Sequence, residues 1–188
     1  MTSGTPTDER SGGADGVPDA PGAGRVVVGV DGSPGAFAAL VWTLAAAARS
    51  GAEVEVVSTF PVGAYWTDPY RADAGRTDTA RSDTEARTRA FLAEAMGEPT
   101  VTAVPRAAAV RVHVTVGAGT PAEYLVRRAE GARLLVVGSR GRGGVRSTLL
   151  GSVALHCAVH APCPVMVVRP QPARAPAAPR AAAAPASP

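Results

Sequence analysis

Glycine and arginine dominate one stretch of the chain, residues 138–152, which reads GSRGRGGVRSTLLGS. The apolar run Leu134–Val137 precedes it, and the residues after it, Val153–Ala161, have the pattern of a helix. A glycine-rich loop between a strand and a helix directs backbone N–H groups and a helix N-terminus toward an anion. Positive charge comes from Arg140, Arg142 and Arg146. We therefore interpret this stretch as a phosphate-binding loop.

The elements that must position this loop alternate between strand and helix along the chain. Apolar runs predict strands at residues 25–30, 53–60, 110–116, 134–137 and 165–168. Helices between them are predicted to open at Ser33-Pro34, at the capping-box pattern of residues 82–85, at Thr120-Pro121 and after the loop. Residues 63–79 are expected to be irregular. Such alternation predicts a doubly wound α/β domain whose parallel sheet carries helices on both faces.

The strand ends indicate where a ligand would bind. In open parallel sheets a ligand binds beyond the carboxyl ends of the strands, at the point where the winding direction reverses. The two most apolar strands end at Asp31 and Gly138. If these strands are neighbours, their loops frame one crevice. The strand at residues 110–116 instead alternates strictly between apolar and polar residues, which is typical of an edge strand.

Length and composition define the folded unit. The chain has 188 residues, and we expect one domain at residues 25–169 between disordered tails at 1–24 and 170–188. The formal net charge is +3, and every basic residue is arginine. Without a basic cluster beside aromatic residues, nucleic-acid binding is not expected. Without a membrane-spanning run, a secretory signal or a disulfide framework, the expected location is the cytoplasm.

Several common nucleotide-binding loops are excluded by spacing. A P-loop needs a lysine, which the chain lacks, and a Rossmann GxGxxG loop starting at Gly141 would need glycine where Arg146 stands. Residues 11–16, SGGADG, resemble the SGGxDS loop of ATP pyrophosphatases. They lie in the N-terminal tail, however, and Gly16 replaces the required hydroxyl.

The loop does resemble a different known motif. Gly138-x2-Gly141-x9-Gly151-Ser152 matches the G-2x-G-9x-G-[S/T] motif of the ATP-binding branch of the universal stress protein family. The segments VVVGVDGS, GTPAEYL and HAPCPVMVVRP are also similar to that family. The resemblance covers about residues 25–169. It implies a five-stranded parallel sheet in the order 3-2-1-4-5, which makes the first and fourth strands neighbours.

The resemblance also implies a ligand, ATP with or without Mg²⁺, and the residues that would contact it. The positions that match contacts to adenosine are Val30, Asp31, Thr59, Val137 and Gly138. Those that match contacts to the ribose and phosphates are Arg140, Gly141, Gly151, Ser152 and Val153. Purely local roles stay open for some of them, because Asp31 also suits a turn or helix cap, and Gly138 and Gly141 also suit a strand end and a turn.

Three functional hypotheses follow. The first is an ATP-binding stress-response or signalling module with at most slow ATP hydrolysis, because no general base is held close to a nucleophile. The second is a homodimeric scaffold with a vestigial pocket or another ligand such as cyclic AMP. The resemblance implies pairing through the last strand, and Val165–Val168 is an apolar edge that needs cover. The third, a nucleotidyl transferase, would need an HxGH-type motif where DGSP follows the first strand.

A set of histidines and cysteines near the end of the domain raises the question of a metal site. These residues are His156, Cys157, His160 and Cys163. The two histidines share one helix face, whereas Cys157 points about 100° away from them and Cys163 follows a proline. Structural zinc sites usually take paired ligands from turns. We therefore expect no metal site here.

Overall fold

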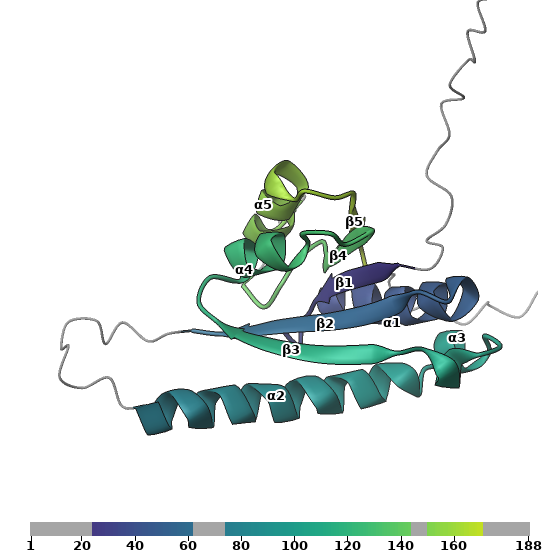
Figure 1. Cartoon of the computed structure of the whole chain (residues 1–188), viewed down its shortest axis with the longest axis horizontal. Helices are drawn as coiled ribbons and strands as arrows, with labels where there is room; N and C mark the ends of the chain where they lie inside the picture. The colour runs from purple at the N-terminus through teal and green to yellow at the C-terminus, as the bar shows by residue number, and fades with distance from the viewer. Residues whose placement is uncertain (1–23, 62–73, 144–149, 171–188) are drawn as a thin grey trace, which may run out of the picture.

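The chain folds around one parallel sheet (Figure 1). A computed structural model describes residues 24–61, 74–143 and 150–170. The sheet has five strands in the order β3-β2-β1-β4-β5, which confirms the predicted α/β fold and strand order. The strands are β1 (Arg25–Gly29), β2 (Glu53–Phe60), β3 (Val112–Ala118), β4 (Leu134–Gly138) and β5 (Val165–Val168). The helices are α1 (Pro34–Ser50), α2 (Ala74–Met96), α3 (Pro99–Thr102), η2 (Ala107–Ala109), α4 (Pro121–Arg128) and α5 (Ser152–His160).

Two helical layers bury the two faces of the sheet. Val26 and Val28 of β1 point into a core that is shared with α1 and α2. The residue between them, Val27, points into a second core under α4 and α5, together with Leu125 and Leu135. This alternation follows from the two-residue period of a strand. The apolar runs of the central strands are therefore buried on both sides, and Figure 1 shows the helices on the two faces of the sheet.

The start and end of α1 form as its sequence predicts. The hydroxyl of Ser33 caps the helix by accepting a hydrogen bond from the Ala36 N–H at 3.2 Å, and Pro34 is the first helical residue. Gly51 ends the helix in the left-handed conformation, with φ of 74°, and its N–H donates to the Ala47 carbonyl. These caps fix the helix directly behind the carboxyl end of β1, where the predicted crevice begins.

The prediction for α2 was wrong at its start. The helix begins at Ala74, so the capping-box pattern of residues 82–85 lies inside it. Glu85 of that pattern does not cap a helix start but forms an ion pair with Arg89 one turn later. Thr84 of that pattern is buried, so it packs inward within the helix and does not mark a helix start. Of the predicted irregular segment, residues 63–73 lie outside the described part of the chain, and residues 74–79 were wrongly predicted because they form the first turns of α2.

Strand β3 also differs slightly from its prediction. It runs from Val112 to Ala118, two residues later than expected, because Thr59 and Phe60 at the end of β2 pair with Gly117 and Ala118. Its position at the sheet edge is confirmed. Residues 1–23 and 171–188, which hold nearly all of both predicted tails, lie outside the description. Within the described ranges, no helix is long and apolar enough to cross a membrane.

A buried carboxylate joins four elements beneath α4. Glu55 of β2 is 3% exposed. It accepts hydrogen bonds from Thr115 of β3 at 2.8 Å, from Arg128 of α4 at 2.7 Å and from Arg25 of β1 at 2.5 Å. Burial by itself raises the pKa of Glu55, but the hydrogen bonds from Thr115, Arg25 and Arg128 and the charge of Arg128 outweigh it, so the pKa lies below its ordinary value.

We expect Glu55→Gln to lower the free energy of unfolding by about 2 kcal/mol at neutral pH. This loss is smaller than that on breaking a fully buried ion pair, because both arginines are partly exposed. A carboxyl whose pKa is lowered by folding stabilises the protein above its unfolded-state pKa. Its contribution is lost as the pH falls below the ordinary value of 4.5 and through the folded value. Urea unfolding at several pH values should therefore show the difference between variant and wild type shrinking in acid.

The matched control is Glu53→Gln. Glu53 pairs with Arg111 at 2.5 Å, but both side chains are more than one third exposed, so its loss should change stability by less than about 1 kcal/mol. If Glu55→Gln and Glu53→Gln lowered the free energy of unfolding equally, the hydrogen bonds of Glu55 would have no special role in stability.

Candidate functional site

A cleft of about 950 Å³ opens at the carboxyl ends of β1, β2 and β4. All ten residues that the sequence nominated line it, although they come from four separate parts of the chain. They are Val30, Asp31, Thr59, Val137, Gly138, Arg140, Gly141, Gly151, Ser152 and Val153. The strand order brings them together, because β1 pairs directly with β4 and with β2. The structure thus has the crevice that the strand ends predicted.

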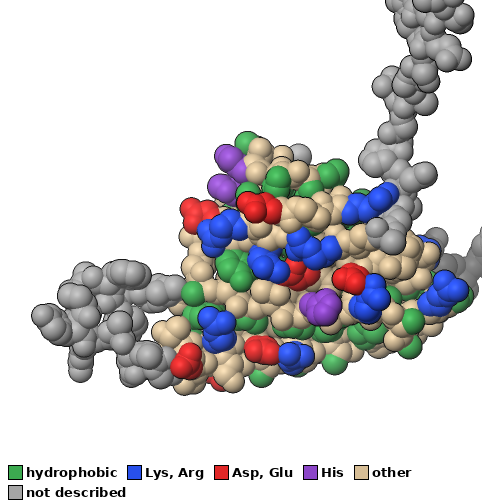
Figure 2. All heavy atoms as spheres, in the orientation of Figure 1, with side chains coloured by type: hydrophobic (Ala, Val, Ile, Leu, Met, Phe, Trp, Pro, Cys, Tyr) green, Lys and Arg blue, Asp and Glu red, His purple; other side chains and the backbone are tan. Residues whose placement is uncertain are grey.

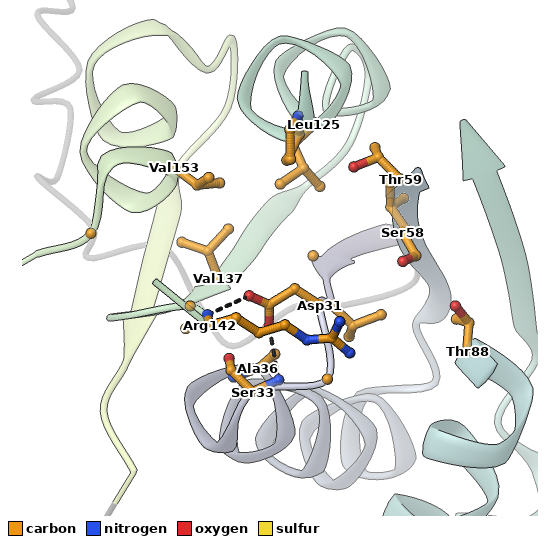
Figure 3. A pocket seen from close by; sticks show the side chains of 18 of the residues that line it. Asp31, Ser33, Ala36, Ser58, Thr59, Thr88, Leu125, Val137, Arg142 and Val153 are labelled. Atoms are coloured by element: carbon orange, nitrogen blue, oxygen red, sulfur yellow. Dashed lines mark hydrogen bonds between the residues drawn. The ribbon is translucent and has the colours of Figure 1, made fainter. Parts of the chain in front are cut away.

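Asp31 joins the two loops that frame this cleft (Figure 3). Its Oδ1 accepts a hydrogen bond from the Ser33 N–H at 2.9 Å, within its own loop. Its Oδ2 accepts one from the Arg142 N–H at 3.1 Å, in the loop after β4. Asp31 therefore has the local turn role that the sequence left open, and it also spans the crevice. Asp31 is exposed to solvent and lines the cleft.

Glycines let the backbones of the two loops touch. A Cβ on Gly138 would lie 2.5 Å from the carbonyl carbon of Gly35 and 2.8 Å from the Ala36 nitrogen, so no side chain fits between β4 and the start of α1. A Cβ on Gly141 would lie 2.5 Å from the carboxylate of Asp31. The Ser33 hydroxyl adds a hydrogen bond to the Arg140 carbonyl at 3.3 Å. Gly138 is thus required for the packing of backbone against backbone, whereas a side chain at Gly141 would displace the Asp31 carboxylate.

The opposite end of the loop leads into α5. The Gly151 N–H donates to the Ser139 carbonyl at 2.8 Å, which closes the loop on itself. Gly151 is the N-cap of α5 in extended conformation, and Ser152 and Val153 form its first turn. The first N–H groups of a helix have no partner within it. A Cβ on Gly151 would meet nothing closer than 3.5 Å, so this glycine leaves room in front of those N–H groups without being needed for packing.

Arginine side chains give the cleft its positive charge. Arg140 and Arg142 both line it. The Arg142 guanidinium reaches across the cleft below Asp31 (Figure 3) and lies over Gly32, where a Cβ would come within 2.5 Å of it. Arg146, the third arginine of the predicted loop, lies outside the described residues.

The sequence analysis did not nominate the residues that α2 and α4 contribute to the cleft. Helix α2 contributes Thr84, Arg87, Thr88, Ala90, Phe91 and Glu94, and α4 contributes Pro121 and Leu125. Ser58 also lines the cleft, next to the nominated Thr59. The one available signal was the spacing of Thr84, Thr88 and Phe91, which places them on one face of a helix. The predicted helix already held these three residues, but only the fold shows that this face lines the cleft.

The histidines and cysteines of α5 are divided between surface and core. The rings of His156 and His160 stack with centroids 4.3 Å apart, and His160 is exposed. Cys157 is completely buried beneath α5, and its burial raises the pKa of the thiol to about 11. Within the described ranges, no group of three or more potential metal ligands comes together.

The surface over the sheet and α4 carries charges of both signs rather than a basic patch. In Figure 2, arginines and acidic side chains are interspersed on this face. Among the described side chains, this view shows no continuous basic surface of the kind that binds a nucleic-acid backbone.

Comparison with known proteins identifies the family. The model of the universal stress protein family matches residues 22–169. The chain belongs to the universal stress protein family. A universal stress protein of Thermus aquaticus is 35% identical over 147 residues, which cover 77% of this chain and 97% of that protein. One from Mycolicibacterium smegmatis is 35% identical over 153 residues, which cover 78% of this chain and 46% of that protein. The chain therefore spans about half the length of its mycobacterial relative.

Solved structures of this family share the fold. UspA from Lactobacillus plantarum superposes with a TM-score of 0.64 at 20% identity, covering 79% of this chain and 99% of that one. A universal stress protein in complex with cAMP gives 0.51 at 24% identity, covering 80% and 100%. An Arabidopsis thaliana family member with AMP bound gives 0.50 at 18% identity, covering 82% and 96%. At these identities the likeness establishes the architecture alone.

The close contact between Gly138 and α1 generates a prediction. Gly138→Ala should destabilise the protein by about 2 kcal/mol, because the added methyl group meets backbone atoms that cannot move independently. Gly143→Ala is the matched control, since a Cβ there meets nothing within 4 Å, and it should change stability by less than about 0.5 kcal/mol. Thermal or urea unfolding measures both. Equal stability of the two variants would contradict the packing role of Gly138.

Proposed function

We propose that this universal stress protein binds ATP, with or without Mg²⁺, in the cleft between Asp31 and the residue 138–153 loop, and acts as a stress-response or signalling module. The observation that carries the proposal is the placement of the glycine-rich loop and the N-terminus of α5 opposite Asp31. Backbone N–H groups and two arginines suit a polyphosphate. The exposed Asp31 carboxylate suits hydroxyl groups of a ribose.

Relatives support an adenine nucleotide as the ligand. One family structure holds cAMP and another holds AMP, so the same fold accommodates adenine nucleotides with different phosphate groups. The matching G-2x-G-9x-G-[S/T] spacing favours a longer phosphate chain, because the N-terminus of α5 at Gly151 and Ser152 lines the same cleft as Gly138 and Gly141 and offers N–H groups at a second place. We propose a cytoplasmic protein.

Efficient catalysis is not part of the proposal. Both oxygens of the Asp31 carboxylate already accept backbone hydrogen bonds, which suits this group to holding the loops in place rather than to removing a proton from water. Any ATP hydrolysis should therefore be slow. Binding and the response to it are the activity that we propose.

Gly151→Val tests the site directly. The extended backbone of Gly151, with φ of −74° and ψ of 160°, suits valine, and the added carbons have room. The fold should be spared while the phosphate chain is kept away from the N-terminus of α5. Isothermal titration should show saturable ATP binding by the wild type and at least tenfold weaker binding by the variant. No binding and no thermal shift of the wild type at millimolar ATP would refute the proposed function.

A second copy of the chain is the partner that we propose, paired through β5. This strand lies at the sheet edge, next to β4 only, and an apolar edge strand needs cover. The helix packed on it exposes Leu155 and Val159, which are 55% and 68% exposed. The greater length of the mycobacterial relative also favours pairing, because a chain of about twice this length could hold two such domains.

Sedimentation at micromolar concentration tests this pairing. We expect a dimer of the full chain and dissociation when Val167→Lys places a charge in the β5 edge. A wild-type monomer at that concentration would contradict pairing, and a dimer that persists in the variant would exclude β5 as its interface.

A further inference from the structure

Two histidines form a pair on the outer surface of α5, away from the cleft. His156 and His160 are four residues apart, and the helical repeat places them on the same face. Their rings stack with centroids 4.3 Å apart and an interplanar angle of 24°. Figure 2 shows two histidine side chains side by side on the surface over this helix. Neither residue lines the cleft, so the pair is separate from the proposed nucleotide site.

A backbone hydrogen bond decides which nitrogen of the His160 ring carries a proton. Nδ1 of His160 lies 3.0 Å from the carbonyl oxygen of His156. A carbonyl oxygen can only accept, so Nδ1 donates, and the lone pair of the neutral ring is on Nε2. Histidines that bind metals usually have this arrangement, in which the second ring nitrogen donates to a carbonyl or carboxylate. His160 therefore has the tautomer that a metal ligand needs.

The ring of His156 supplies a second nitrogen at a suitable distance. Two Zn–N bonds of about 2.0–2.1 Å at a tetrahedral angle join nitrogens that are about 3.4 Å apart. Stacked rings whose centroids are 4.3 Å apart reach this separation by small rotations about their side-chain bonds. His160 is exposed and His156 is partly exposed, so solvent reaches both rings. The pair can therefore chelate an ion without any movement of the helix.

The surroundings of the pair limit the kind of metal site that it can form. The described part of the chain brings no third protein ligand to these histidines, so water must complete the coordination. HExxH metalloproteases take two zinc ligands at the same spacing, but they also need a glutamate directly after the first histidine. Cys157 stands at that position and is completely buried. The arrangement therefore suits an exchangeable ion, not a hydrolytic centre.

We propose that His156 and His160 bind one divalent transition-metal ion on the outer face of α5. Imidazole nitrogens suit Zn²⁺, Cu²⁺ and Ni²⁺, whereas Mg²⁺ and Ca²⁺ prefer oxygen ligands. The site is thus distinct in place and in chemistry from any Mg²⁺ that accompanies a nucleotide. It goes beyond the proposed function and does not depend on it.

Zinc titration of the nucleotide-free full chain tests this site. Zn²⁺ is a suitable probe because it has no redox chemistry and both cysteines are free. Calorimetry should show one Zn²⁺ bound per chain. His156→Gln and His160→Gln should each bind Zn²⁺ at least tenfold more weakly, because a single imidazole lacks the second bond of the chelate. Both substitutions are at solvent-accessible positions, so the fold should be retained.

His113→Gln is the matched control. The chain has three histidines, and His113 is exposed on β3, on a different element from the pair. Its loss should leave Zn²⁺ binding unchanged. Cys163→Ser controls for the thiol that follows α5, which donates to the Pro164 carbonyl at 3.5 Å. This variant should also bind Zn²⁺ as the wild type does.

NMR of the wild type gives a second measurement that needs no variant. Zn²⁺ should shift the ring signals of His156 and His160 but not those of His113, and Mg²⁺ should shift none of them. The proposal is refuted if the wild type binds no Zn²⁺, if both variants of the pair keep wild-type affinity, or if the ring signals of the pair do not move. Loss of binding in His113→Gln or Cys163→Ser, or one ion per two chains, would also overturn a site formed by the pair within one chain.

Discussion

The carboxylate of Asp31 is the group on which the geometry of the cleft depends. Its two oxygens hold backbone N–H groups from loops more than one hundred residues apart in sequence, those of Ser33 and Arg142. Hydrogen bonds to an ionised acceptor are stronger than those between neutral groups. One side chain thereby fixes both the turn that starts α1 and the path of the chain after β4.

That role is possible only because the backbones around Asp31 come unusually close. β1 and β4 are neighbours, and Gly138 brings the end of β4 against Gly35 at the start of α1 with no space for a methyl group between them. Behind this contact, the Ser33 hydroxyl both caps α1 and binds the Arg140 carbonyl. The N-terminus of α1, the strand ends and the glycine loop therefore form one continuous hydrogen-bonded unit. A side chain added at Gly35 or Gly138 should therefore also displace the Ser33 and Arg140 backbone of this unit.

The features that could be predicted from sequence are those with a local physical cause. Ser33-Pro34 and Gly51 fix the ends of α1 through their own backbone preferences, and continuous apolar runs revealed the central strands. The strand order came from a resemblance to a family, and all ten nominated residues line the cleft because that order joins their loops. Whether they contact a nucleotide stays a prediction.

What could not be predicted depends on contacts distant in sequence. The capping-box pattern of residues 82–85 gave a false start for α2, which begins at Ala74. Thr84 and Thr88 are buried in the folded chain, and no local sequence pattern shows that polar residues of this helix pack inward. In the sequence, Glu55 looks like its neighbour Glu53 in the same strand. Only the fold brings Arg25, Arg128 and Thr115 to Glu55. β3 shifted by two residues because its register follows the end of β2.

The two sides of the cleft are built from different groups. The loop side consists largely of backbone N–H groups and glycines, whose geometry is independent of side-chain identity. The α2 side presents the hydroxyls of Thr84 and Thr88, whose hydrogen bonds stay within the helix. Substitutions in α2 can therefore change the lining of the cleft without disturbing the hydrogen bonds by which Asp31 joins the two loops.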